Sequence, residues 1–396
     1  MADSTIRGLR RAYVLMGAAD GTLLPFIPLY LAERGLGAGA IGAVLAASAL
    51  AALVAGLAWA YLADRRVPPE RLVVAASVVA AAVALSLPVA SGAAAIAAVI
   101  VVITIVRSPL ALLDPITLRR LRTTSRTDYA RIRLRMSAGW TASALATGAL
   151  YEAGGLRLIP LLYVPLSLAV GLWVWRRVRP DGAAEVDAVR PAVRVRTVPV
   201  SMAGFLVACL LLGVSLTATQ NFLVLQIDYL GGGALLVGAA AAFQALTEIP
   251  TMGYTHVLTR RLGHRVLFAV GCVIYLAVFI AWAFVGSALV AALLKLVTGV
   301  AFALVFVSAV MIANDLTPSR LRATGQALMK SVMFGVAPIA GALGGGLVYG
   351  TLGPRVMFLG GTVVVGAAGL LALLAVPSPR RAPSEETVLA PSTVTP

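Results

Sequence analysis

The sequence predicts an all-α integral membrane protein with about twelve transmembrane helices in two six-helix repeats around a central cavity. Of its 396 residues, 60% are hydrophobic and only 12% are charged, and the mean hydropathy is +0.95. A soluble domain carries about 25% charged residues, so the chain lacks the charges that a water-facing shell requires. The composition therefore excludes a soluble enzyme, a nucleic-acid-binding domain and a disordered chain, and it indicates membrane lipid as the surrounding medium.

The individual helices follow from apolar stretches of about 20 residues, the length that crosses a bilayer. Lipid offers no hydrogen bonds to the backbone, so each stretch is expected to be helical. The first stretch has no cleavage site after it and is expected to be retained. In chain order the predicted spans are 10–31, 39–62, 72–90, 93–118, 134–153, 158–177, 201–225, 234–257, 266–285, 288–312, 323–349 and 355–376.

These spans fall into two groups of six, separated by a polar segment rich in arginine and proline. The predicted domains are an N-terminal bundle (1–177), a basic cytoplasmic linker (178–200), a C-terminal bundle (201–376) and a disordered cytoplasmic tail (377–396). The tail is expected to be disordered because it is rich in Pro, Ser and Thr and poor in large apolar residues.

Arginines predict the orientation. The formal net charge is +16, and the arginines cluster in the loops on one side of the predicted spans, 26 against 3 on the other side. Cytoplasmic loops carry an excess of basic residues, so both termini are expected to be cytoplasmic. We therefore predict a multi-pass protein of the cell membrane, and we expect a monomer.

The two halves repeat each other at a nearly constant offset. Gly42 corresponds to Gly238, 196 residues later in the chain. The end of the second span corresponds to the end of the eighth at the same offset. Gly148 corresponds to Gly346 at an offset of 198. Parallel six-helix repeats of this kind place a substrate site at the repeat interface.

Several motifs resemble the major facilitator superfamily over essentially the whole chain. The segment 60–66 occupies the position of that superfamily's loop signature, with Asp64, Arg65 and Arg66 matching it. It departs from the pattern where glycines are replaced by Ala60 and around Val67. Segments 25–30, 129–133, 137–139 and 248–250 are more specifically similar to the branch of lactose-permease-like, nucleoside–proton and phenylpropionate permeases. The resemblance implies two bundles that alternate access to a central cavity.

Six ionisable side chains are candidates for positions well inside the predicted spans, away from their ends, where each costs about 2.5–3.5 kcal/mol on insertion scales. They are Asp20, Arg107, Asp114, Glu248, Lys295 and Lys330. One interpretation is that they form permanent ion pairs that orient helices; the other is that they switch partners during transport. In the resembled fold the first and fourth helices border the cavity, so Asp20 and Arg107 are expected to meet. Arg107 and Asp114 share a helical face, which predicts that Arg107 alternates between Asp20 and Asp114 or binds a substrate carboxylate or phosphate.

Glu248 is the predicted proton-coupling residue, with Asp20 as the second candidate. Glu248 follows Gln244 by one turn, and Pro250 removes a backbone hydrogen bond beside it. A buried carboxyl without a close cation favours its neutral form, and a group that is neutral in one state and charged in another can carry a proton. Lys295 or Lys330 is expected to neutralise Glu248 in one conformation, with Lys330 preferred by depth. The alternative for Lys295 is snorkelling to the outer interface.

Neutral polar and aromatic residues predict the substrate-binding surface. Thr217, Gln220 and Asn221 share one face of the seventh span, and Gln244 and Phe302 lie on the eighth and tenth. Trp140 and Tyr151 lie on the fifth span, where they either stack on substrate or pack against helices. No cofactor, metal or catalytic residue is predicted, because no phosphate-binding loop or cluster of metal-ligating residues occurs.

The function that these features predict is secondary active transport of a small organic solute, by proton symport of a sugar, nucleoside or aromatic acid. One alternative is a proton-antiport exporter of drugs or hydrophobic metabolites. A more distant alternative is a channel or a non-transporting membrane scaffold. A scaffold does not require buried titratable groups in both halves, so neutralising these groups distinguishes it from a carrier.

Overall fold

The computed structural model describes residues 2–122, 129–178, 199–318 and 321–377, and within these ranges every regular element is a helix. The predicted all-α membrane fold is confirmed. Nine helices in the described ranges are long and apolar enough to cross a membrane. The predicted linker and tail lie outside the described residues, apart from their first or last positions.

The first bundle runs from the N terminus to the end of α8. Its elements are α1 (Ala2–Leu23), η1 (Leu24–Phe26), α2 (Ile27–Glu33), α3 (Ala38–Arg65), α4 (Pro69–Ala84), α5 (Ala93–Arg107), η2 (Ser108–Leu112), α6 (Leu113–Arg122), α7 (Tyr129–Gly154), η3 (Leu156–Leu158) and α8 (Ile159–Arg177).

The second bundle contains fewer but longer elements. They are α9 (Val200–Tyr229), α10 (Gly233–Phe284), α11 (Ala288–Asp315), α12 (Arg322–Ser331), the π-helical segment η5 (Val332–Val336) and α13 (Ala337–Ala375). Both α10 and α13 carry two of the predicted spans, joined at Gly263 (φ 75°) and Gly353 (φ 85°). Glycine accepts this left-handed backbone conformation without steric cost, so the chain reverses there.

The structure differs from the predicted spans mainly where proline interrupts a helix. The predicted span 93–118 is divided between α5 and α6 by the 3₁₀ segment η2, which contains Pro109. A proline removes one backbone donor and clashes with the preceding turn, so the α-helix ends at Arg107. Similarly, η1 contains Pro25 and separates α1 from α2. Helix α4 ends at Ala84, before the predicted limit of 90.

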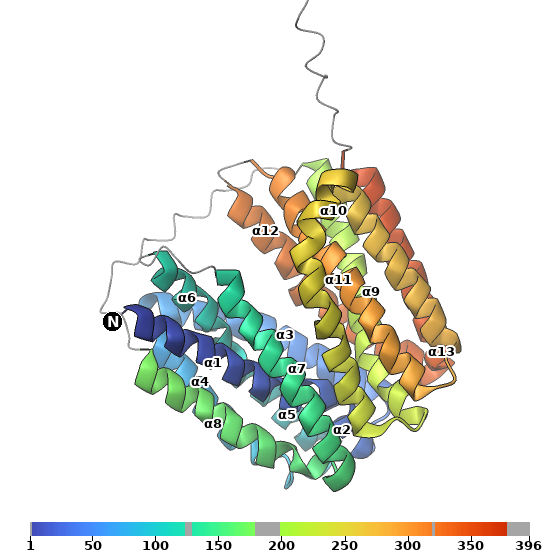
Figure 1. Cartoon of the computed structure of the whole chain (residues 1–396). Helices are drawn as coiled ribbons and strands as arrows, with labels where there is room; N and C mark the ends of the chain where they lie inside the picture. Colours follow the sequence, from blue (N-terminus) through green and yellow to red (C-terminus); the bar gives the residue numbers. More distant parts are fainter. Residues whose placement is uncertain (1, 123–128, 179–198, 319–320, 378–396) are drawn as a thin grey trace, which may run out of the picture.

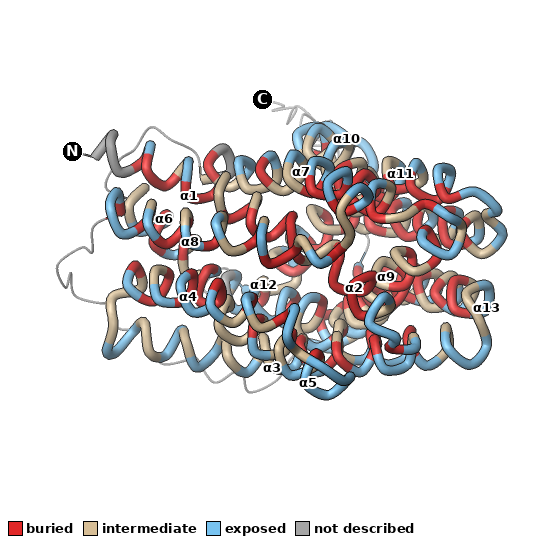
Figure 2. The backbone as a smooth tube through the Cα atoms, turned by 90° about the horizontal axis from the view of Figure 1, so that it is seen from below, coloured by how far each residue is buried: buried red, intermediate tan, exposed pale blue. Residues whose placement is uncertain are grey.

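Large apolar side chains cover the outer surface of the bundles. Leu57, Val363 and Leu374 are 71%, 72% and 75% exposed, and the exposed positions lie mostly on the outward sides of helices such as α3 and α13 (Figure 2). Such a surface is unfavourable in water but matches the hydrocarbon of a bilayer. Burial is concentrated between the helices, where the bundle interiors pack.

The two bundles approach each other near α2 and separate toward α6 and α12 (Figure 1). At the joined end, α3 crosses α13 and α7 crosses α10, and both crossings are formed by glycines. A Cβ on Gly42 would lie 2.9 Å from the Cα of Gly346, and one on Gly148 would lie 3.2 Å from the Cα of Gly238. The four glycines are the two repeat-related pairs of the sequence, so the crossings are related by the internal symmetry.

A polar contact also connects the two bundles at their joined end. The Glu152 carboxylate at the end of α7 accepts a hydrogen bond of 3.2 Å from the backbone N–H of Leu235, in the first turn of α10. Free N–H groups and the helix dipole at a helix N terminus both favour a carboxylate. This contact links the two bundles beside the crossing of Gly148 and Gly238.

Candidate functional site

A cavity of about 570 Å³ lies between the two bundles. Its walls come from η1, α2, α7, α9, α10, α11 and η5. Eight of the residues singled out in the sequence line it, namely Trp140, Thr217, Gln220, Asn221, Gln244, Glu248, Lys295 and Phe302. The cavity volume is within the usual range for small-molecule sites, about 300–1,000 Å³.

Lys295 is the polar centre of the cavity. It lies two turns into α11 and is buried, and its ammonium group donates hydrogen bonds to the side-chain oxygens of Gln220 on α9 and Gln244 on α10. Both amide oxygens therefore face one cation, so three helices are joined through it. The side chain does not snorkel to the outer interface; it points into the protein.

Glu248 lies one turn beyond Gln244 on α10, and Lys295 acts on it electrostatically. The ion pairs within 4.0 Å in the described part of the chain do not include Glu248. The carboxyl therefore faces the cavity with a cation nearby but outside direct contact. A group in this position can bind a proton, a substrate hydroxyl or the Lys295 ammonium.

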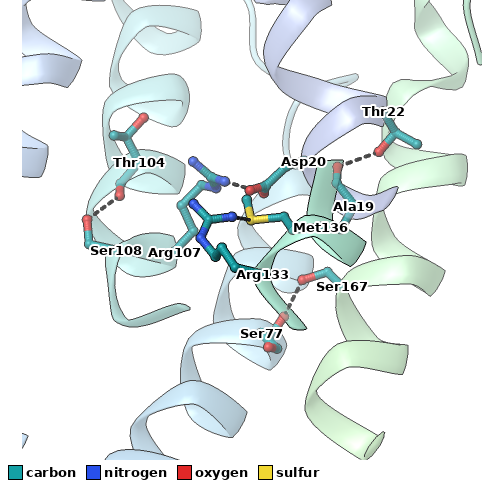
Figure 3. Close-up of polar contacts among 10 residues, drawn as sticks. All are labelled: Ala19, Asp20, Thr22, Ser77, Thr104, Arg107, Ser108, Arg133, Met136 and Ser167. Carbon is teal, nitrogen blue, oxygen red and sulfur yellow. Dashed lines mark hydrogen bonds and ion pairs between the residues drawn. The ribbon is translucent and has the colours of Figure 1, made fainter. Parts of the chain in front are cut away.

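Asp20 and Arg107 form an ion pair, as the sequence predicts, but they do not line the cavity. Asp20 lies on α1 and Arg107 is the last residue of α5, and Figure 3 shows the two side chains pointing toward each other. The side chains are 5% and 16% exposed. The pair therefore joins α1 and α5 within the N-terminal bundle.

Asp114 lies apart from this pair. Its carboxylate accepts a hydrogen bond of 2.6 Å from the Tyr13 hydroxyl and lies 3.6 Å from the Arg133 guanidinium. The predicted common face of Arg107 and Asp114 assumed one continuous helix, whereas η2 separates the two residues. Contact between Arg107 and Asp114 is not seen in this conformation.

Three other groups of predicted residues also lie outside the cavity lining. Lys330 is exposed near the end of α12. Tyr151 is buried; its hydroxyl donates to the carbonyl of Thr22 at 2.8 Å, and its ring packs against Phe26. The loop-signature residues Asp64, Arg65 and Arg66 are exposed at the end of α3.

The structure adds residues that the sequence reasoning did not assign. The cavity is also lined by Arg133, Met136, Ser137, Tyr275, Met333 and Phe334. Arg133 and Ser137 belong to segments 129–133 and 137–139, which are similar to the branch of lactose-permease-like, nucleoside–proton and phenylpropionate permeases. This similarity was a sequence signal that could have identified them. Outside the cavity, buried Glu70 accepts from Arg119 at 3.1 Å and lies 3.7 Å from Arg120. An acidic residue directly after two prolines in a basic loop was the signal for this cluster.

We expect the Asp20→Asn variant to lose about 3–5 kcal/mol of folding stability, because Arg107 would remain buried without its counter-charge. Thermal unfolding in detergent, followed by size-exclusion fluorescence, measures the loss. The double variant Asp20→Asn with Arg107→Gln removes both charges and should recover most of the stability. Equal stability of the wild type and the Asp20→Asn variant would contradict a structural role for the pair.

Among the described residues, the structure brings together no group of three or more His, Cys, Asp or Glu side chains that could hold a metal ion. Cys209 and Cys272 are both buried and free. The polar groups of the cavity are amides and hydroxyls, one carboxyl, one ammonium and the Arg133 guanidinium. Such groups suit reversible binding of an organic solute.

Comparison with known proteins agrees with this geometry. A family model described as the MFS_1 like family matches residues 6–360. The chain is 27% identical over 365 residues to the maltose permease of Geobacillus stearothermophilus, which covers 91% of this chain and 92% of that protein. These matches confirm the superfamily resemblance.

Solved structures give the same fold. The nucleoside transporter NupG superposes with a TM-score of 0.77 at 18% identity, covering 94% of this chain and 98% of that one. The POT family transporter PepTSo superposes with a TM-score of 0.71 at 11% identity, covering 94% and 97%. At these identities the likeness establishes the architecture.

Proposed function

The chain belongs to the MFS_1 like family and is a multi-pass membrane transporter, and from this premise we propose that it carries a sugar- or nucleoside-like solute together with a proton. The observation that carries the proposal is Glu248, a titratable carboxyl that faces the cavity between the two bundles. Transport requires the cavity to open alternately to each side. The bundles joined at one end and separated at the other represent one of the two states.

Amide side chains support a solute rich in hydroxyl groups. Gln220, Asn221 and Gln244 each offer a donor and an acceptor, so a row of them can pair with several hydroxyls at once. The relatives named above include a maltose permease and a nucleoside transporter, whose names specify hydroxyl-rich solutes. An apolar drug would leave these amides unpaired, at a cost of about 1–3 kcal/mol for each buried group.

Proton coupling would work through the environment of Glu248. When Glu248 is charged, Lys295 balances it across the cavity; when Glu248 is protonated, the ammonium keeps its two amide partners. A solute that competes for these amides shifts Lys295 and thereby changes the affinity of Glu248 for its proton. Binding of proton and solute is then linked, as coupling requires. Asp20 is the second proposed proton site and acts inside the N-terminal bundle through Arg107.

The proposal is tested by internal pH in proteoliposomes that contain the full chain, after sugars, nucleosides, aromatic acids and hydrophobic cations are added outside. Symport carries protons inward with the solute, so internal pH is expected to fall. A rise in internal pH would indicate antiport. Equilibration of a labelled solute without a pH change would show a uniporter and contradict proton coupling. We further propose that both termini are cytoplasmic and that the protein works as a monomer in the cell membrane.

A further inference from the structure

Three phenylalanines form a compact aromatic cluster at the cavity. Phe302 and Phe306 on α11 stack with ring centroids 5.6 Å apart and planes 4° apart. Phe334 meets both rings edge-on at 61°, with centroid distances of 6.4 Å and 5.8 Å. Phe302 and Phe334 line the cavity. We call these three residues the aromatic platform.

The aromatic platform is separate from the polar groups of the cavity. Phe302 follows Lys295 by seven residues on the same helix, which places it two turns, or about 10 Å, farther along the axis. Lys295 binds Gln220 and Gln244, so one part of the cavity offers hydrogen bonds and another offers flat apolar rings. A solute that extends along the cavity can contact both parts at once.

The backbone near Phe334 supports a role in binding. Residues Val332–Val336 form a π-helix, a rare conformation that is less stable than an α-helix and occurs frequently at functional sites. Within this segment Met333 is buried, while Phe334 is 46% exposed. The chain thus uses an unfavourable local geometry where a phenylalanine borders the cavity.

We propose that the aromatic platform is a subsite for a flat unsaturated ring, so that the solute joins a hydroxyl-rich part to such a ring, as nucleosides and aryl glycosides do. This inference rests on the proposed function and narrows its substrate class. Aromatic rings favour edge-to-face and offset contacts with one another. The hydroxyl-rich part would meanwhile pair with the amides around Lys295. A plain disaccharide can offer the phenylalanines only the C–H face of a sugar ring, whereas an unsaturated ring offers a flat π face and polar edges.

The test is calorimetric binding to the purified full-length protein with matched ligand pairs, phenyl glucoside against methyl glucoside and uridine against ribose. Stacking of an unsaturated ring on aromatic side chains strengthens binding. We therefore expect the ring-bearing member of at least one pair to bind about tenfold tighter. The pair that responds distinguishes an aryl glycoside from a nucleoside.

Two variants test whether the tighter binding of the ring-bearing ligand depends on the aromatic platform. Phe334→Leu keeps an apolar side chain but removes the ring, and it should weaken binding of the ring-bearing ligand far more than binding of the plain sugar, which abolishes the difference within the pair. Val336→Ala is the matched control, because Val336 is exposed in the same π-helix and does not line the cavity. Equal binding of both members of each pair, equal weakening of both by Phe334→Leu, or no binding of any ring-bearing ligand would overturn the subsite.

Failure of the aromatic subsite can be distinguished from failure of proton coupling. A ring-bearing ligand that binds through Phe334 but moves no proton in the proteoliposome assay would leave the subsite in place and contradict proton coupling. Proton flux with a plain sugar that is unaffected by Phe334→Leu would support the proposed function and overturn the subsite.

Discussion

In the Glu248→Gln variant, accumulation of solute driven by a pH gradient is expected to disappear, while exchange of labelled for unlabelled solute continues. For one proton per solute, each pH unit supports about a tenfold concentration ratio. A glutamine keeps the shape and hydrogen-bonding capacity of the side chain but cannot bind and release a proton. The ratio of internal to external solute should therefore fall to one at any imposed gradient.

The matched control for this variant is Asp315→Asn. Asp315 is an exposed carboxylate at the end of α11, in the same bundle but away from the cavity lining. Its neutralisation should leave accumulation at the wild-type level. If Glu248→Gln still accumulates solute fully, the proton is carried elsewhere, and Asp20 is tested next in the double variant Asp20→Asn with Arg107→Gln, which is expected to keep the fold.

A side chain at either glycine crossing is expected to reduce transport to background. A Cβ on Gly42 would lie 2.9 Å from the Cα of Gly346, and a Cβ on Gly238 would lie 3.1 Å from the Cα of Gly148. Backbone atoms this close cannot yield without the helices separating. Gly42→Val and Gly238→Val should therefore prevent the joined end from closing, so the alternation of access stops.

Gly344→Ala provides the control, because Gly344 lies on the same helix as Gly346 and a Cβ there meets nothing within 4 Å. The state of the joined end can be followed by alkylation of a cysteine placed at Leu36, which is buried in the wild type. Alkylation should be faster in the two valine variants. Wild-type transport in Gly42→Val, or an equal loss in Gly344→Ala, would contradict the gating role.

Much of this architecture could be predicted from the sequence, because lipid requires helices and their length is set by the bilayer. The cavity residues of α9 and α10 could be identified from helical spacing. This spacing places Thr217, Gln220 and Asn221 on one face of α9, and it places Gln244 and Glu248 on one face of α10. The repeat in the sequence relates Gly42 to Gly238 and Gly148 to Gly346. The structure was needed to show that these glycines contact one another between the two bundles.

Other parts could not be predicted, because spacing arguments assume an uninterrupted α-helix. The break at Pro109 separates Arg107 from Asp114, and the π-helix near Phe334 adds a residue to one turn without a distinctive sequence signal. The depth of each lysine within its predicted span also did not indicate which of the two faces the cavity. Lys330 lies outside the cavity lining, whereas Lys295 lies at its polar centre.

The apolar core has a consequence for the empty carrier. One cluster of buried side chains runs continuously through both bundles at their joined end, from Leu36 and Ile41 to Ala234 and Val237, whereas a second cluster belongs to the N-terminal bundle alone. Parting the bundles at the joined end divides the shared cluster, so contacts formed as the opposite end closes must replace those that are lost. The balance between these two sets of contacts determines the resting populations of the two access states, and solute binding shifts that balance only by its different affinity for the two states.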